Sequence, residues 1–463
     1  MKQQINSKIF KEYDIRGQYP QELNEQTAYA LGLAFVKLTK AKKIIIGRDA
    51  RPESEKIFWP LISGLVKAGA KIDDLGICAT PELFFAVGTK KYDSGCMVTA
   101  SHSPQGQTGF KFCNRQGVVY GSNTGLLKLA RLAEKQKEKF SSADLKQKTK
   151  NIDFTSVATD YKKFALSFVK PDKLKGLKIV LDASGGSGAR LADALFQALP
   201  VRAVFMNFRA RDKYPDHGPN PLLPENQRPI KQAIKFEQAD LGVIFDGDGD
   251  RAIFFDEAGQ LVEPYYINCL LAEIMLKKKK GLTVAIDARL GLALSAVIKK
   301  NNGRVLRHRS GYANFISTMS RKKLLFGCEN SGHFMFNFKL KNKPSFVYGD
   351  ALIPILLILN RLKSERLKLS QAIKPFQDQY LISGELNFQT AKFETVKKIL
   401  KKNFSAAKID ELDGLSVFGP KAEWFFNLRS SHTESLVRLN IEAKSSVRLN
   451  QLKDEIVSVI DCL

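Results

Sequence analysis

One plan of strands and helices occurs three times along this 463-residue chain, and it constrains the fold more than any single motif does. Each copy opens with an apolar run that ends in aspartate, at residues 42–51, 177–188 and 282–291. A helical stretch follows, then a second strand, then a third strand within residues 95–104, 241–251 and 324–333. Strands that alternate with helices are typical of parallel sheets covered by helices on both faces. The sequence therefore predicts an α/β protein with repeated architecture.

The pattern changes from about residue 369 to a smaller α+β tail, with a helix at 394–404 and strands near 423–435 and 437–443. The lysine-rich stretch 134–150 is typical of a solvated helix end and linker. We predict three tandem α/β domains with mixed, mostly parallel sheets, over residues 1–150, 151–255 and 256–368. A fourth, α+β domain covers residues 369–463.

Charge and composition limit the classes of partner. The formal net charge of +26 invites a nucleic-acid hypothesis, because basic surfaces bind phosphate backbones, but the lysines are spread over surface runs without a recognition motif. No apolar run reaches the roughly 18–20 residues of a membrane span. The six cysteines show no CxxC spacing, which indicates neither a disulfide framework nor a zinc site. We expect a cytoplasmic protein with neither a nucleic acid nor a membrane as its partner.

Three carboxylates at alternate positions, Asp246, Asp248 and Asp250, end the third strand of the second copy. Like charges about 4 Å apart repel by about 4 kcal/mol at an effective dielectric of 20, so converging carboxylates call for a cation. Oxygen ligands suit Mg²⁺ or Ca²⁺. An EF-hand calcium loop is the alternative on spacing, but Arg251 stands where its turn requires glycine, and a buried strand precedes the loop.

The corresponding loop of the first copy carries Ser101 just past a strand. A serine there is ordinarily a turn residue or a helix cap. His102 follows it, however, and Lys111 can return to the same edge of the sheet. A nucleophile or phosphoryl carrier needs such exposure and such acid–base neighbours.

Two further loops offer polar groups of the kind that bind sugars and phosphates. Residues 327–334 present Glu329, Ser331 and His333 in a glycine-flanked turn, which alone is a weak signal. Residues 429–435 begin with Arg429 after an apolar strand and suit a phosphate cradle, with a capped turn as the alternative. Of the five histidines, His102, His333 and His432 lie in these loops, which core packing explains poorly.

Taken together, the loops resemble those of the α-D-phosphohexomutase superfamily, in the same order. The resemblance covers essentially the whole chain and includes the motifs YDIRG at 13–17, GRDAR at 47–51, TASH at 99–102 and DGDGDR at 246–251. It implies three α/β domains and a smaller fourth domain around a central cleft. It also implies a Mg²⁺-dependent isomerase that moves a phosphoryl group between C1 and C6 of a hexose, with a hexose 1,6-bisphosphate as intermediate and activator.

The resemblance also implies a role for each loop. Ser101 is then the phosphoserine, and its phosphate joins Asp246, Asp248 and Asp250 as metal ligands. The transferred group is surrounded by Tyr13, Arg16, His102, Lys111 and Arg251, with His333 as an acid–base candidate. Sugar hydroxyls are bound by Glu329 and Ser331. The phosphate that is not transferred is gripped by the last loop, through Arg429, Ser431, His432 and Thr433.

The chain departs from the family pattern at several positions. Ser103 and Thr108 each replace a usual Asn, and Ser435 replaces a usual Pro. In residues 307–316, Tyr312 stands where the family commonly has histidine and Ile316 where it has lysine. The cationic contact that the family's lysine would make is therefore missing at Ile316, and Arg307 or Arg309 is the expected substitute.

Residues 214–226 look like the corresponding loop of the phosphomannomutase/phosphoglucomutase branch. We therefore expect a phosphorylated hexose as the substrate and a monomer or weak dimer, with phosphoglucosamine mutase as the runner-up. A non-catalytic phosphosugar-binding homologue is the rival of another class. The retained Ser101 and the complete aspartate triplet argue against it.

Overall fold

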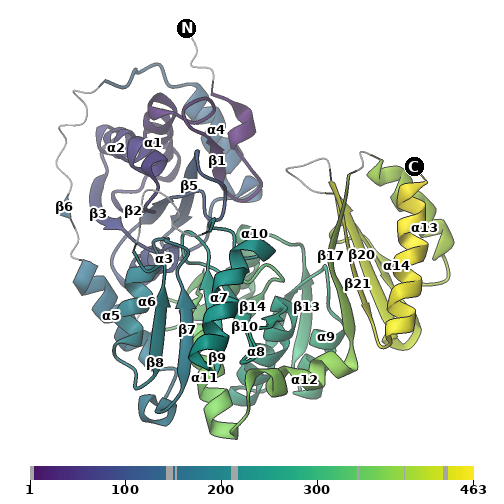
Figure 1. Cartoon of the computed structure of the whole chain (residues 1–463). Helices are drawn as coiled ribbons and strands as arrows, with labels where there is room; N and C mark the ends of the chain where they lie inside the picture. The colour runs from purple at the N-terminus through teal and green to yellow at the C-terminus, as the bar shows by residue number, and fades with distance from the viewer. Residues whose placement is uncertain are drawn as a thin grey trace. The chain divides into compact units, whose positions relative to one another are not determined.

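The computed structural model describes residues 5–141, 150–151, 154–209, 217–340, 344–389, 392–430 and 436–462 (Figure 1). The chain forms two compact units. The first comprises Met1–Leu261, Gly311–Lys323 and His333–Arg366. The second comprises Val262–Ser310, Leu324–Gly332 and Leu367–Leu463. Among the described residues, no helix combines the length and the apolar character needed to span a membrane.

The first sheet of the first unit has six strands in the order β1-β5-β4-β2-β3-β6. The central strand β2 pairs in parallel with both β3 and β4, whereas β5 pairs antiparallel with β4 and β1. The strands are β1 (Ile15–Gln18), β2 (Lys43–Arg48), β3 (Lys71–Ile77), β4 (Ser94–Val98), β5 (Gln107–Asn114) and β6 (Lys150–Asn151). The helices of this region are α1 (Glu25–Thr39), α2 (Pro52–Lys67), α3 (Thr80–Thr89) and α4 (Leu126–Glu134).

Local sequence sets the ends of these helices. The Asn24 side chain accepts a hydrogen bond from Thr27 N (3.0 Å) and caps α1, and Pro52 occupies the first turn of α2, where no amide hydrogen is needed. Figure 1 shows α1 and α2 side by side. Gly32 of α1 permits this contact, since a Cβ at that position would lie 2.5 Å from the carbonyl oxygen of Leu61 in α2.

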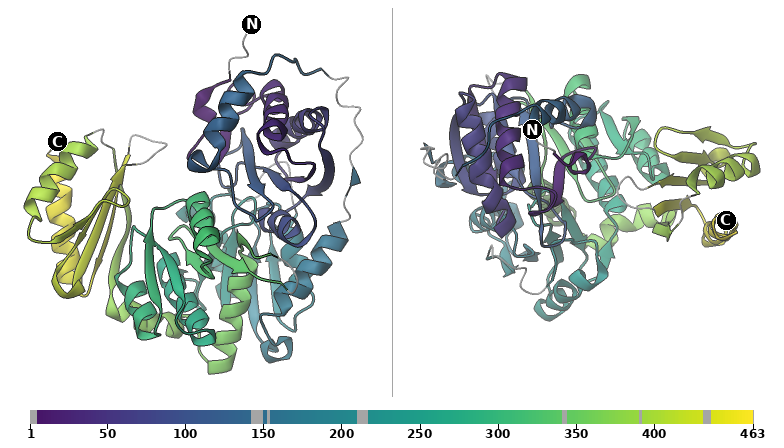
Figure 2. Two further views of the ribbon diagram at one scale, coloured as in Figure 1. Left: turned by 180° about the vertical axis from the view of Figure 1, so that it is seen from behind. Right: turned by 90° about the horizontal axis from the view of Figure 1, so that it is seen from above.

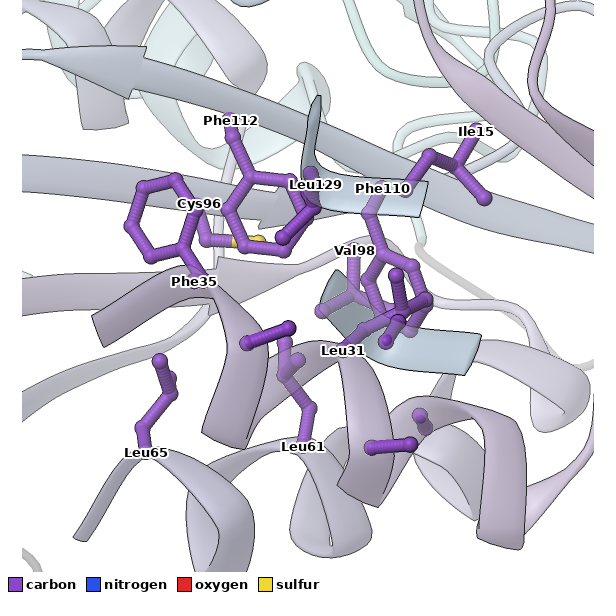
Figure 3. Close-up of a cluster of buried hydrophobic side chains, with 14 of the residues drawn as sticks. Ile15, Leu31, Phe35, Leu61, Leu65, Cys96, Val98, Phe110, Phe112 and Leu129 are labelled. Carbon is purple, nitrogen blue, oxygen red and sulfur yellow. The ribbon is translucent and has the colours of Figure 1, made fainter. Parts of the chain in front are cut away.

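The apolar core beneath these helices includes residues of β4, the strand that precedes Ser101 (Figure 3). Phe35 of α1 stacks on Phe112 of β5 with ring centroids 4.3 Å apart, and Val98 at the end of β4 is fully buried beside Phe110. Burying one such apolar side chain contributes about 1.5–3 kcal/mol. Packing against side chains of α1 and β5 therefore fixes the position of the end of β4.

A second sheet of the first unit has the order β11-β10-β9-β7-β8. Strand β7 pairs in parallel with β8 and β9, and β10 runs antiparallel to β9. The elements are β7 (Lys178–Asp182), β8 (Arg202–Met206), β9 (Leu241–Phe245), β10 (Ala252–Phe255), β11 (Leu261–Val262), α5 (Phe154–Leu166), α6 (Ala189–Phe196) and α7 (Pro224–Glu237).

The third sheet repeats this arrangement in the order β13-β12-β14-β15-β16, with β12 parallel to β13 and β14. Strands β12, β13 and β14 belong to the second unit, and β15 and β16 belong to the first. The strands are β12 (Thr283–Asp287), β13 (Arg304–His308), β14 (Phe326–Cys328), β15 (Phe334–Phe338) and β16 (Phe346–Gly349). The helices are α8 (Pro264–Lys278), α9 (Leu292–Lys300), α10 (Tyr312–Lys322) and α11 (Leu352–Glu365).

The fourth sheet lies in the second unit and has the order β17-β21-β20-β19-β18, with antiparallel pairing throughout. Two helices, α13 and α14, pack on one face of it through a shared apolar cluster (Figures 1 and 2). The elements are α12 (Leu369–Gln379), β17 (Leu381–Gln389), α13 (Phe393–Asn403), β18 (Lys408–Asp410), β19 (Leu415–Phe418), β20 (Trp424–Ser430), β21 (Leu436–Ala443) and α14 (Ser446–Asp461).

The predicted alternation of strands and helices is confirmed, and so is the α+β character of the tail, whose antiparallel pairing is a finding of the structure. Each predicted opening strand is an interior strand of its sheet, and each third strand pairs in parallel with it. The three proposed boundaries between the four domains stay a prediction.

Candidate active site

Ser101 lies three residues past the end of β4 in a left-handed backbone conformation, with φ of 54°. Such a conformation is costly for a residue with a side chain and persists only where its surroundings enforce it. The amide of Ser101 donates to Thr99 Oγ1 (2.8 Å). The residue is only 2% exposed, so the expectation of an exposed serine is wrong, because the loop packs against the aspartate loop. Ser101 Oγ donates to Asp246 Oδ2 (3.0 Å), which ties this loop to the aspartate loop.

The buried side chain of Arg51 binds the backbone of the Ser101 loop. Arg51 Nη2 donates to the carbonyl oxygens of Ser101 and Ser103, each at 2.7 Å, and Nη1 donates to that of Pro104 (3.0 Å). Arg51 Nε lies 3.2 Å from Asp49 Oδ2, which also accepts from Thr99 Oγ1 (2.7 Å). Because a guanidinium presents its donors in a fixed plane, this contact fixes the loop as a unit.

The aspartate loop joins β9 to the antiparallel strand β10. Asp246, Asp248 and Asp250 are fully buried, and each offers a carboxylate oxygen within 4.8 Å of the others. The loop glycines allow a close approach, since Gly249 has φ of 71° and a Cβ there would lie 2.8 Å from Gly188 Cα. Two strands rather than two helices flank the loop, so the EF-hand alternative is wrong.

The electrostatics of the triplet depend on Lys111, whose Nζ lies 2.7 Å from both Asp248 Oδ2 and Asp250 Oδ2. Burial works to lower the pKa of Lys111, but the charges of Asp248 and Asp250 outweigh it and raise that pKa. Burial, followed by the charges of Asp250 and Asp248, raises the pKa of Asp246 to about 8. Burial also acts to raise the pKa of Asp250, but Lys111 and His333 hold it well below its usual value.

These residues fit a hard divalent cation. The triplet carries three formal negative charges against the single charge of Lys111 and the nearby Arg251, whose Nε lies 3.5 Å from Asp246 Oδ2. Asp248 Oδ1 is buried and has no hydrogen-bond partner among the described residues. Thr80 Oγ1 donates to the other oxygen of Asp248 (2.5 Å) and so orients it. A phosphate on Ser101 would add further negative charge.

Two histidines lie beside this cluster in the first unit. His102 Nδ1 is 3.2 Å from Ser101 Oγ, and burial, then the charges of Arg251 and Arg16, hold the pKa of His102 well below its usual value. His333 Nε2 accepts from Arg251 Nε (3.2 Å) and lies 3.3 Å from Asp250 Oδ1. The neutral form of His102 is therefore favoured.

The N-terminal motif contributes Arg16 and Tyr13 to the same unit. Arg16 Nη1 donates to Ser103 Oγ (2.8 Å) and Nη2 to Asp14 Oδ2 (2.5 Å). Burial works to lower the pKa of Arg16, but Asp14, and then Asp248, outweigh it and raise that pKa. Tyr13 packs on Gly311, where a Cβ would lie 2.1 Å from the ring.

The second unit holds the loop with Glu329 and Ser331. Glu329 is 3% exposed, and its carbonyl oxygen accepts from Asn268 Nδ2 (3.3 Å). The next amide, Asn330 N, donates to Asp287 Oδ2 at the end of β12 (3.3 Å). The loop is thus anchored to the opening strand of its own repeat.

Arg429 lies at the end of β20, also in the second unit, with its Nη2 3.9 Å from Glu385 Oε2. Burial, and then the charge of Arg289, lowers the pKa of Arg429. The other predicted members of this loop lie outside the described residues; they are Ser431, His432 and Thr433.

Sequence profiles of one family match along the chain. Phosphoglucomutase/phosphomannomutase α/β/α domains I, II and III match residues 7–139, 158–259 and 263–380, and the C-terminal domain of the same family matches residues 385–459.

The chain belongs to the phosphoglucomutase/phosphomannomutase family.

Relatives agree with this assignment. A phosphomannomutase of Vibrio cholerae serotype O1 is 32% identical, over 97% of this chain and 98% of the relative. One of Methanocaldococcus jannaschii is 33% identical, over 98% and 97%. The crystal structure of a phosphoglucomutase/phosphomannomutase family protein from Burkholderia thailandensis superimposes with a TM-score of 0.84, at 28% identity over 99% of this chain and 98% of that one. The predicted family and fold class are confirmed.

Two departures from the phosphoglucomutase/phosphomannomutase pattern lie inside α10. Ile316 is fully buried, and Tyr312 is 9% exposed, with its ring 5.3 Å from that of His333 and its hydroxyl accepting from Gly349 N (2.7 Å). Both positions therefore serve packing in this chain. Arg307, a suggested substitute for the missing cation, donates to Ala288 O (2.9 Å) and Ser416 Oγ (3.1 Å).

The sequence patterns assigned no role to Arg51, which ends the GRDAR motif, or to Thr80. The available signal was position, since Arg51 follows β2 and Thr80 follows β3, which are parallel strands of the same sheet as β4, the strand before Ser101. Their contacts to the Ser101 loop and to Asp248 depend on tertiary structure, which the local pattern does not encode.

Proposed function

We propose that this chain is a phosphomannomutase/phosphoglucomutase that interconverts hexose 1-phosphate and hexose 6-phosphate through a phosphorylated Ser101. The observation that carries the proposal is the 3.0 Å contact of Ser101 Oγ with Asp246, inside a buried aspartate triplet that Lys111 partly neutralises. The names of the full-length relatives support the same activity.

The proposed reaction has two transfers. First, the bond between phosphorus and Ser101 Oγ breaks while a bond forms to the free hydroxyl of a hexose monophosphate; that hydroxyl loses a proton, and Ser101 Oγ gains one and becomes a hydroxyl again. The resulting 1,6-bisphosphate turns around and returns its other phosphate to Ser101. His333 is the candidate that takes and returns the proton, because it adjoins Arg251 and Asp250 in the same cluster.

Catalysis of phosphoryl transfer is mostly positioning and charge neutralisation. Lys111, Arg16 and Arg251 supply fixed positive charge in the first unit, and Arg51 holds Ser101 in place. Asp246, Asp248 and Asp250, with a Ser101 phosphate oxygen, would hold Mg²⁺. When bound, that ion neutralises charge on the transferring group.

The second unit supplies the proposed sugar and phosphate contacts. Glu329 and Ser331 bind sugar hydroxyls, and Arg429 binds the phosphate that is not transferred, together with Ser431, His432 and Thr433. A bidentate guanidinium contact is the strong way to hold a phosphate. The cytoplasmic location and the monomeric or weakly dimeric state stay predictions.

A coupled assay with the 1-phosphates of mannose, glucose and glucosamine tests the proposal. We expect Mg²⁺-dependent turnover of mannose and glucose phosphates, and none in Ser101→Ala at unchanged thermal stability. Preferred turnover of glucosamine phosphate would support the phosphoglucosamine mutase alternative. Binding of phosphosugars without turnover would support the non-catalytic homologue.

A further inference from the structure

Three guanidinium groups surround one carboxylate in the second unit. Glu385 Oε1 lies 3.2 Å from Arg438 Nη1, and Glu385 Oε2 lies 3.2 Å from Arg289 Nη1 and 3.9 Å from Arg429 Nη2. The arginine side chains are largely buried, and that of Glu385 is 28% exposed. We call these four residues the arginine cluster.

The sheet register explains why the arginine cluster needs its carboxylate. Arg429 and Arg438 are directly paired on the antiparallel strands β20 and β21, so their side chains leave the same face of the sheet. Like charges in that arrangement repel. Glu385 of β17 pairs with Asn440, two residues from Arg438, and therefore also faces that side. Its negative charge offsets the repulsion.

The arginine cluster keeps capacity for a further anion. Arg289 already pairs with Asp287, with Nε 2.9 Å and Nη2 2.5 Å from Oδ2. Three cations thus form ion pairs with two carboxylates, and the charge of a third carboxylate, Asp413, also acts on Arg429. Burial works to raise the pKa of Glu385, but Arg289 and Arg438 outweigh it and lower that pKa, so Glu385 is ionised. Arg429 Nε is a buried donor with no hydrogen-bond partner among the described residues.

We propose that Glu385 is an internal counter-anion of the phosphate site, which weakens the hold of Arg429 on a bound phosphate. This inference rests on the proposed function, in which Arg429 binds the phosphate that is not transferred. A mutase of this type must let the bisphosphate turn between two transfers, so an over-tight grip slows each cycle. The carboxylate and a bound phosphate repel each other and compete for the same guanidinium donors.

Glu385→Gln tests this directly, because the amide keeps the shape and one acceptor oxygen while removing the charge. We expect KM for glucose 1-phosphate to fall about tenfold, since about 1.4 kcal/mol corresponds to a factor of ten, and kcat to fall as well. Loss of structure would instead raise KM. The matched control is Glu411→Gln, which removes a carboxylate that pairs with Lys397 and Lys401 away from the arginine cluster and should leave both constants unchanged.

Calorimetry with inorganic phosphate separates failure of this inference from failure of the proposed function. The affinity that is lost in Arg429→Ala reports this site, and Glu385→Gln should strengthen it. If Glu385→Gln binds phosphate no more tightly than the native chain, Glu385 is not a counter-anion, whatever the activity. If the native chain turns over no hexose phosphate, the proposed function is wrong, and the phosphate affinities still decide the role of Glu385.

Discussion

Arg51→Lys should separate positioning of Ser101 from the stability of the fold. The native guanidinium makes three hydrogen bonds of 3.0 Å or less to carbonyl oxygens of the Ser101 loop. A hydrogen bond with a charged partner contributes about 1.5–3 kcal/mol. A lysine amine keeps the ion pair with Asp49 but cannot reach all three carbonyls, because it lacks the planar fork. The variant thus loses about 3 kcal/mol or more of the energy that holds the loop.

Displacement of the Ser101 loop in Arg51→Lys should lower the turnover number, kcat. A reacting atom displaced by about 1 Å can cost about a hundredfold in rate, so we expect kcat of Arg51→Lys to fall about a hundredfold with KM little changed. Steady-state kinetics on glucose 1-phosphate and thermal unfolding are the measurements. Arg48→Lys is the matched control, since Arg48 pairs with the exposed Glu55 (3.3 Å) and should tolerate the change. Native kcat in Arg51→Lys, or an equal loss in Arg48→Lys, would refute the reasoning.

Further predictions concern the metal, the phosphate grip and the core. Chelation with EDTA should abolish turnover, and Mg²⁺ but not Ca²⁺ should restore it; activity that persists in EDTA contradicts the assigned site. Thr80→Val should weaken Mg²⁺ affinity about tenfold, measured by activation kinetics, because it removes one of the two side-chain hydrogen bonds that orient Asp248. Arg429→Ala should raise KM and lower kcat alike for glucose and mannose 1-phosphates, with partial recovery in Arg429→Lys; unchanged constants would remove its role. Phe112→Ala should cost about 3–5 kcal/mol in urea unfolding.

The fold was predictable because each repeat has a short apolar strand that ends in a charged or polar loop. The runs before Asp49, Asp182 and Asp287 are too short for helices of comparable burial, and all three are interior strands of their sheets. The sequence did not predict which antiparallel strands pair next to β4 and β9. Pairing partners depend on contacts distant in the sequence, which periodicity does not specify.

The candidate site was predictable to the extent that its residues follow strands. Ser101 follows β4 of the first sheet and the aspartate triplet follows β9 of the second, so the position of ligands beyond the carboxyl ends of parallel strands predicts each loop separately. Their contact with each other and with Lys111, which lies within the antiparallel strand β5, depends on tertiary structure. Arg51 and Glu385 were not identified, since an arginine or a glutamate in a strand or turn is ordinary until its partners are known. Their roles come from contacts across 44 or more positions of the chain.

The central claim is that Ser101 carries the transferred phosphate. Peptide mass analysis of the native chain after incubation with glucose 1,6-bisphosphate tests it most directly. We predict one phosphoryl group, on the peptide that contains Ser101, and its loss when excess glucose 1-phosphate is added. No phosphate should appear in Ser101→Ala. Phosphate on another residue, or full mutase activity in Ser101→Ala, would contradict the account.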